Sequence, residues 1–410
     1  MFVFYIIALL PVLAGGILWV YDRNINWMEW VGGSAFGFIA AAIMHIIAFK
    51  GMTDDVETLS GQLVQATYYS AWTEYYEWEE TKQVKHGSGK DAYYTTEHVA
   101  WIPTTEYHSE SFDAASNIGT SYDLSGETYA DIKRKFGEEH AVPGTRYVIG
   151  HHNSYMESGD PNDYVASNRT GIIIPVTAPH TWTNRIKAAP SVFSYMPVPA
   201  GTPVFPYPAS TDPFTSNRLL GCAKTTVSTL AFDQMNARLG PVKHVNVILV
   251  GFVGHSMELA KSQEAAWVGG KKNDIVICYG YGDPHPDLHA KPDWVKCFGW
   301  AEHAVIKHDL EDIFLDANGG VTDVVLPALE HEVAANWQIK DWHKFDYINI
   351  EPPAWSYFAF IGFLIVSQAG WYFFCHQEAF GKSDEEENLI GGRANRPSRR
   401  TRTYSGLNDD

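Results

Sequence analysis

Three long apolar stretches constrain the fold of this chain more than any other feature. Residues 1–20 and residues 30–49 contain no charged side chain, and a third apolar run covers residues 355–374. About 20 apolar residues in helical conformation cross the hydrocarbon core of a bilayer. The sequence therefore predicts three transmembrane helices. The first is expected to be retained, because it lacks the basic start of a signal peptide.

Small residues suggest how these helices pack. Gly33, Gly37 and Ala41 recur at every fourth position of the second run, which permits close approach of another helix. We expect residues 1–50 to form a two-helix transmembrane hairpin and residues 352–375 to contain the third transmembrane helix. His45, near Lys50, is expected at the membrane interface.

Basic residues predict the orientation. The first loop carries Arg23, and the densest basic cluster lies in the last 20 residues, at Arg393, Arg396, Arg399, Arg400 and Arg402. Lys and Arg near membrane helices favour the cytoplasmic side. We therefore expect an integral protein of the cell membrane, with residues 51–350 extracytoplasmic. The polar tail, residues 376–410, is expected to be disordered and cytoplasmic.

The extramembrane region has two patterns. Residues 51–213 show short aromatic and β-branched runs between turn signals, which predict a β-rich, loop-heavy unit after a short juxtamembrane helix. This unit is expected to end in a Pro-rich linker. Residues 214–346 alternate strand and helix patterns, including a buried strand over residues 274–281 and a helix over residues 305–315, and predict an α/β layered domain with a mixed sheet. In that domain one helix is expected to end at Gly240 and the next to be capped by Ser256. The expected fold class is an α+β membrane-anchored protein.

Residues 244–316 carry a resemblance to a known family. HVNVILV, SMELAKSQEAAWVGGKKND and DIVICYGYG place a strand and a helix before a Lys-Asn-Asp entry into a hydrophobic strand and a hairpin. This order resembles the TPM domain. The stretch from Trp267 to Asp274 is also similar to uncharacterised membrane proteins of tailed bacteriophages. The resemblance implies a domain displayed outside the membrane, with roles such as phosphatase activity, metal binding or complex assembly. It carries over no catalytic residue.

The same Lys-Asn-Asp stretch has a local explanation. Gly269 and Gly270 let the chain reverse after the helix, and Asn273 with Asp274 can form a turn into the strand. On this interpretation Lys271 and Lys272 stay in solvent.

One alternating stretch holds metal-ligand side chains. Between the two strands of the predicted hairpin, carboxylate and imidazole alternate at Asp283, His285, Asp287 and His289. Two interpretations stay open. The loop can fold back and hold a divalent metal ion, or it can be a solvated hairpin tip. Pro284 and Pro286 favour the tip, because they push the backbone towards a three-fold helix that spreads the side chains. A divalent metal ion is thus the one cofactor to consider, and none is assured.

Other motifs lack a residue that a catalytic or metal site requires, or are expected to be surface loops. Gly254–Glu258 resembles a nucleophile elbow around Ser256, but Glu258 stands where a small residue is required. His331 and Glu332 begin a zinc motif whose second histidine is missing. The loop with His151 and His152 is expected to be a surface loop.

Cys278 and Cys297 fall on neighbouring strands of the predicted hairpin, and a turn centred on residues 287–288 places them nearly opposite each other. A disulfide between them and two buried free thiols are both compatible with the sequence, and free thiols are favoured.

Charge limits the function classes. The chain has 48 acidic against 30 basic residues and a formal net charge of -18, so we expect no nucleic-acid partner. The expected partners are the lipid bilayer and either copies of this chain or other membrane proteins. Without a complete catalytic constellation, the leading hypothesis is a non-catalytic assembly or interaction subunit of a membrane complex, phage-encoded if the resemblance holds. The alternative is a metal-dependent hydrolase of phosphatase type that uses the TPM-like domain. The residues of its active site would be Asp274, Asp293 and the four alternating residues Asp283, His285, Asp287 and His289.

Overall fold

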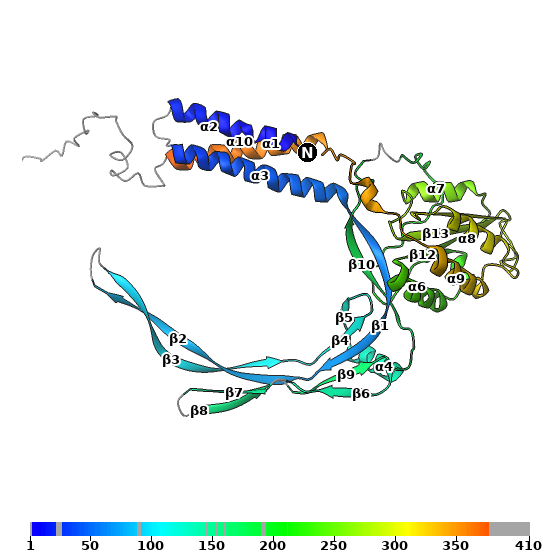
Figure 1. The fold of residues 1–410 in the computed structure, drawn as a ribbon, viewed down its shortest axis with the longest axis horizontal. Coiled ribbons are helices and arrows are strands. Elements are labelled where there is room, and N and C mark those ends of the chain that lie inside the picture. Colours follow the sequence, from blue (N-terminus) through cyan, green and yellow to red (C-terminus); the bar gives the residue numbers. More distant parts are fainter. Residues whose placement is uncertain are drawn as a thin grey trace, which may run out of the picture. The chain divides into compact units, whose positions relative to one another are not determined.

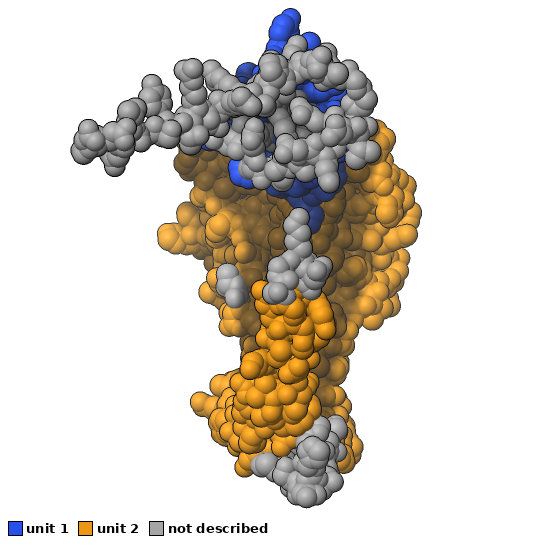
Figure 2. All heavy atoms as spheres, turned by 90° about the vertical axis from the view of Figure 1, so that its left-hand side faces the viewer, with its two compact units in different colours: residues 1–52, 349–410 blue, residues 53–348 orange. Residues whose placement is uncertain are grey.

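The computed structural model describes residues 2–21, 27–87, 92–144, 146–151, 154–159, 161–189, 194–210 and 212–376. Two compact units make up the chain, residues 1–52 with 349–410 (unit 1) and residues 53–348 (unit 2), which Figure 2 shows in blue and orange.

The helices described in unit 1 are apolar (Figure 1), namely α1 (Val3–Ile7), α2 (Leu9–Tyr21), α3 (Trp27–Thr53) and α10 (Ala354–His376). Three stretches are long and apolar enough to cross a membrane: Val3–Tyr21, Trp27–Thr53 and Ala354–Phe374. The three predicted membrane segments are therefore confirmed in length and composition. The last residue of α3, Thr53, already belongs to unit 2.

Glycine allows the helices of unit 1 to pack closely. A Cβ atom added at Gly37 would lie 3.0 Å from Cγ of Pro11 in α2, and one added at Gly33 would lie 3.0 Å from Oε1 of Gln368 in α10. The Gly33 carbonyl also accepts a hydrogen bond of 2.9 Å from Gln368 Nε2. The predicted small-residue face of α3 thus contacts the first helical segment, as expected, and α10 as well.

One sheet of unit 2 is built around a single long strand. β1 (Asp54–Tyr69) pairs antiparallel with β10 along its first half and with β4 and β9 along its second half. α4 (Gly126–Phe136) covers the sheet with Tyr129, Ile132 and Phe136, which pack on Leu63 of β1. The remaining strands are β4 (Ser111–Ser116), β5 (Ser121–Asp123), β6 (Glu139–Val142), β9 (Asp163–Ser167) and β10 (Pro175–Thr183).

The predicted juxtamembrane helix after Thr53 is wrong, because β1 begins at Asp54. Val56, Leu59 and Leu63 match helical spacing, but the segment pairs with β10 up to Gln62 and with β4 from Leu63. Tertiary pairing outweighs the local pattern here.

The second sheet is mixed, as predicted. β11 (Leu219–Gly221), β12 (Asn246–Val253) and β13 (Asp274–Tyr281) are parallel, and β14 (Trp294–Gly299) pairs antiparallel with β13. One face packs against α6 (Thr229–Lys243), α8 (Val305–Leu315) and α9 (Leu326–Asn336). The other face packs against α7 (Glu258–Ala266) and Val204, Phe205 and Tyr207. Short helical pieces complete the unit: α5 (Ala223–Thr226), η2 (Asp323–Val325) and η3 (Trp342–Phe345).

The two sheets of unit 2 meet where α6 crosses β1. A Cβ atom at Gly240 would lie only 2.2 Å from the backbone oxygen of Ser60. Gly240 is therefore a contact residue inside α6, and the predicted helix end at this position is wrong. The helix continues to Lys243, and His244 caps it in the left-handed conformation (φ 54°). The predicted domain boundary near residue 213 runs inside unit 2.

Two hairpins form separate two-stranded sheets that pair with neither of these sheets. β2 (Trp72–His86) pairs antiparallel with β3 (Tyr93–His108), and β7 (Arg146–His151) pairs with β8 (Ser154–Gly159). At about 3.3 Å per residue, the β2–β3 ribbon is about 50 Å long. Nearly all side chains of β3 are exposed or only partly buried.

Candidate functional site

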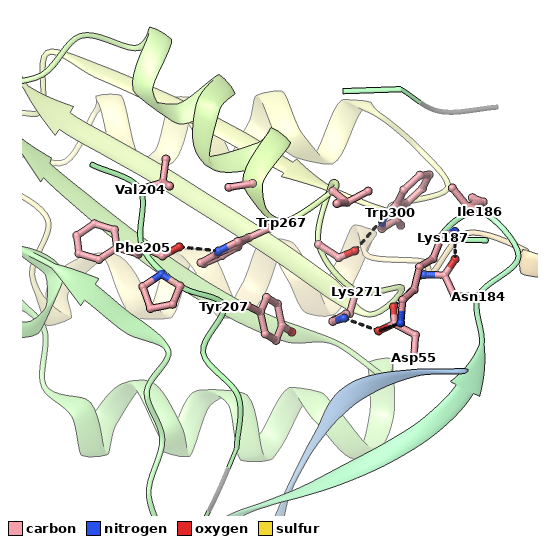
Figure 3. A pocket seen from close by; sticks show the side chains of 14 residues that line it. Asp55, Asn184, Ile186, Lys187, Val204, Phe205, Tyr207, Trp267, Lys271 and Trp300 are labelled. Atoms are coloured by element: carbon pink, nitrogen blue, oxygen red, sulfur yellow. Dashed lines mark hydrogen bonds and ion pairs between the residues drawn. The ribbon is translucent and has the colours of Figure 1, made fainter. Parts of the chain in front are cut away.

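A cavity of about 710 Å³ lies in unit 2 (Figure 3). It is bounded by the start of β1, the turn after β10, the Pro-rich segment and the loop between α7 and β13. Its lining residues are Asp55, Asn184, Ile186, Lys187, Val204, Phe205, Pro206, Tyr207, Ala266, Trp267, Val268, Gly270, Lys271 and Trp300. A volume of this size is typical of small-molecule sites.

The Pro-rich segment forms one wall. As predicted, residues 197–210 contain no helix or strand, yet they do not behave as a free linker. The fully buried side chain of Gln263 accepts from Phe205 N at 2.8 Å and donates to Phe205 O at 3.0 Å. Tyr207 donates from its hydroxyl to Asp274 Oδ2 at 2.9 Å. These bonds hold the segment against the mixed sheet.

Tryptophan supplies the apolar surface. Trp267 Nε1 donates to Phe205 O at 2.8 Å, and Trp300 Nε1 donates to Gly270 O at 3.2 Å. Both indole N–H groups are thus bonded to backbone, so the rings offer apolar surface to the cavity.

Asp55 lies at the polar end of the cavity and contacts the other polar side chains there. Its carboxylate is 5% exposed, accepts from Asn184 Nδ2 at 2.9 Å and pairs closely with Lys271 Nζ. Lys187 Nζ lies 3.9 Å from the same carboxylate and donates to the Asp54 carbonyl at 2.9 Å. One carboxylate therefore faces two ammonium groups.

A buried charge pair lies next to this end. Glu57 of β1 is 0% exposed and pairs with Lys272 at 3.0 Å and with His180 at 2.7 Å. The Lys272 ammonium also lies 4.9 Å from the centre of the Trp182 ring. The expectation that Lys271 and Lys272 stay in solvent is therefore wrong. Both bind carboxylates of β1, which are far away in sequence.

Asn273 and Asp274 complete the link between the two sheets. Asn273 Nδ2 donates to Thr58 O at 2.8 Å. The Asp274 carboxylate accepts from Asn246 Nδ2 at 2.8 Å and from the backbone N of Lys271 at 2.7 Å. Burial raises the pKa of Asp274, while these hydrogen bonds oppose the rise. The backbone N of Asp274 donates to the Lys271 carbonyl at 3.0 Å, so the chain does turn into the strand as expected, but through a backbone hydrogen bond rather than an Asx turn. The contact with β1 was not predicted.

The structure does not gather the four alternating residues. Asp283, His285, Asp287 and His289 are all exposed. Asp283 Oδ1 accepts from His285 N at 2.8 Å, and Asp287 Oδ1 accepts from His289 N at 2.9 Å. These are local Asx turns of the kind Asp forms in loops. The metal site remains a prediction.

Within the described residues, one group of three ligand-type side chains has ligand atoms within 4.8 Å of one another: Glu74, Glu106 and His108. It is on the β2–β3 ribbon. His108 Nε2 lies 3.0 Å from Glu74 Oε2, and the His108 ring stacks on Trp72 with 4.7 Å between ring centres. An ion pair on an exposed ribbon accounts for this geometry.

Among the described residues, no acid or base forms a hydrogen bond with the side chain of Ser256 or His331, and Glu332 accepts one from Asn336 Nδ2 at 2.7 Å. The N-cap residue of α7 is Met257, with no side-chain cap hydrogen bond, so the predicted side-chain cap at Ser256 is wrong. His331 is exposed on α9 and Glu332 is partly exposed, as expected for the solvated face of a helix. The side chains of the His151 and His152 loop lie outside the described residues.

The two strand cysteines do not form a disulfide. Cys297 is opposite Ile277, and Cys278 is opposite Lys296. This one-residue offset places Cys278 in the core beneath α7 and Cys297 in the core beneath α8, because side chains alternate between sheet faces. Both are free thiols, as favoured from the sequence. Burial raises the pKa of both thiols, which makes them poor nucleophiles.

Sequence reasoning missed the cavity, because its polar end joins Asp55, Asn184 and Lys271 from three distant segments. One signal was available. Lys271 and Lys272 come just before a buried strand, where carboxylates are favourable partners. The start of β1 is acidic, and it supplies Asp55 to Lys271 and Glu57 to Lys272. Comparisons with family models, curated proteins and solved structures found no match to this chain.

Proposed function

We propose that this protein is a membrane-anchored assembly protein, whose copies associate through the β2–β3 ribbon. The observation that supports this proposal is the exposed β2–β3 ribbon. In the described part of the chain, β2 and β3 pair only with each other. An isolated two-stranded ribbon is marginally stable in water, and unpaired strand edges are templates for a further strand.

The side chains of the ribbon support the same function. Large apolar groups are strongly exposed along it, at Trp78, Tyr93, Tyr94, Val99 and Tyr107, with exposed fractions from 48% to 69%. Exposed apolar surface of this extent is typical of an interaction site. A partner strand or ribbon would remove it from water.

Charge along the ribbon favours a second copy as the partner. Residues 72–80 and 100–108 contain five glutamates and no lysine or arginine, while residues 81–99 contain three lysines, one glutamate and one aspartate. Two ribbons placed side by side and antiparallel would bring the acidic base of each against the basic tip of the other. A two-fold interface of this kind is self-complementary.

Charge reversal tests this arrangement. Glu106 is exposed and Glu74 is partly exposed near the base, where they face each other across the ribbon, and Lys82 and Lys85 are exposed near the tip. We expect E74K/E106K and K82E/K85E each to weaken self-association of the full-length protein by about tenfold or more, and the quadruple variant that combines them to restore it. The measurement is sedimentation velocity in a mild detergent.

The matched control for the ribbon variants is E258K/K261E, which reverses an exposed ion pair on α7. It is expected to leave self-association unchanged. If all ribbon variants sediment like the wild type, the ribbon is not the interface.

The orientation belongs to the same proposal. The basic cluster at the end of the chain and Arg23 support a cytoplasmic tail, with residues 53–348 on the opposite side. We expect protease added outside intact cells or spheroplasts to digest this region. Full protection of the region, together with digestion in lysed cells, would reverse the orientation.

No specific observation among the described residues favours the alternative hydrolase function. Asp274 is wholly buried and hydrogen-bonded, whereas Asp283 and Asp287 are exposed. The TPM-like and phage relationships stay predictions.

A further inference from the structure

The cavity in unit 2 has two chemically different ends. Val204, Phe205 and Trp267 lie at one end, and Asp55, Asn184 and Lys187 lie at the other (Figure 3). A ligand that fills such a cavity has an apolar body and a polar head. This inference does not depend on self-association through the ribbon.

The polar end favours an anionic head. Asp55 Oδ1 is paired with Lys271, and Asp55 Oδ2 accepts from Asn184. Lys187 lies farther from the carboxylate, at 3.9 Å, and its side chain is 49% exposed. Among the described lining residues, the charged side chains are two lysines and one aspartate. The excess positive charge is at Lys187, where an incoming anion can reach it.

The location in the chain favours a ligand from the membrane. The backbone N of Asn184 donates to the carbonyl of Thr53 at 2.6 Å, and Thr53 is the last residue of the α3 span. Asp55 follows two residues later. The polar end is thus built on the residues that directly follow a candidate membrane span, where amphiphiles are concentrated.

We propose that this cavity binds an anionic amphiphile with a single apolar chain, a fatty acid or a lysophospholipid. The chain contacts Trp267, Phe205 and Val204. The carboxylate or phosphate contacts Lys187. Apolar burial supplies most of the affinity, and the charge-assisted contact selects anions over neutral amphiphiles.

A photoreactive fatty acid with a diazirine in mid-chain tests the site directly. Irradiated with the full-length protein in non-ionic detergent, it is expected to label peptides that contain residues 204–207 or 266–268. Oleate and oleoyl lysophosphatidate are expected to compete, and the stronger of the two identifies a carboxylate or a phosphate head. Oleyl alcohol, which lacks the charge, and acetate, which lacks the chain, are each expected to compete at least about tenfold less well.

Two variants act on different parts of the cavity. K187M removes the exposed charge and is expected to lower labelling about tenfold. A266W fills the cavity from an exposed position of α7 and is expected to abolish labelling there. K261M, on the same helix but outside the cavity, is the control and should label like the wild type.

Three results would overturn the proposal. They are labelling confined to other peptides, equal competition by oleate and oleyl alcohol, and wild-type labelling in both K187M and A266W. Ribbon variants that no longer self-associate should still be labelled, so this proposal and the proposed function fail separately.

Discussion

Replacing Lys272 by methionine is expected to lower the free energy of unfolding of unit 2 by about 3–5 kcal/mol. The substitution leaves the fully buried Glu57 carboxylate with His180 as its remaining ion-pair partner. Removing the lysine partner of a fully buried carboxylate is much more costly than losing a surface ion pair. The measurement is denaturant unfolding of the full-length protein in detergent at pH 7, followed by tryptophan fluorescence.

Two further variants make this result specific. K261M removes a lysine whose ion pair with Glu258 is largely exposed, and we expect a loss below about 0.5 kcal/mol. E57Q/K272M removes both charges of the buried pair and is expected to recover a large part of the lost stability. If K272M unfolds at the same denaturant concentration as K261M, the buried pair does not hold the two sheets together.

The second large effect is expected at Gly240. Alanine normally stabilises a helix interior relative to glycine by up to about 1 kcal/mol. Here the new Cβ atom would meet the Ser60 backbone oxygen at 2.2 Å, so α6 or β1 must move. We therefore expect G240A to destabilise unit 2 by about 1–3 kcal/mol. The same unfolding measurement checks it.

The control for this substitution is G126A at the first residue of α4. A Cβ atom there would lie 3.4 Å from the Phe112 ring, in van der Waals contact. It should change stability little or improve it. Stabilisation by G240A would contradict the close crossing of α6 and β1.

Local sequence patterns predicted most of the mixed sheet and its helices. Asp274–Tyr281 was expected to be a buried strand and Val305–Leu315 a helix, and both have these bounds in the structure. Each has an apolar pattern that ends at clear turn signals. The three apolar helices follow from hydropathy alone.

The failures concern contacts between distant segments. Gly240 looks like a helix end in sequence, but β1 approaches it closely in space. The Cys278 and Cys297 register was misjudged by one residue, because the loop between β13 and β14 fixes it and no short turn motif does. The cavity was not predicted for the same reason. Asp55, Asn184 and Lys271 come together only once both sheets have formed.

We propose that this chain assembles with other copies while it is anchored in a bilayer. Native mass spectrometry of the full-length protein, released directly from carbonate-washed membranes, measures both properties at once. We expect the protein to stay with the washed membranes and to leave them as particles of two or more chains. Protein found in the wash, or single chains alone from the membrane, would contradict it.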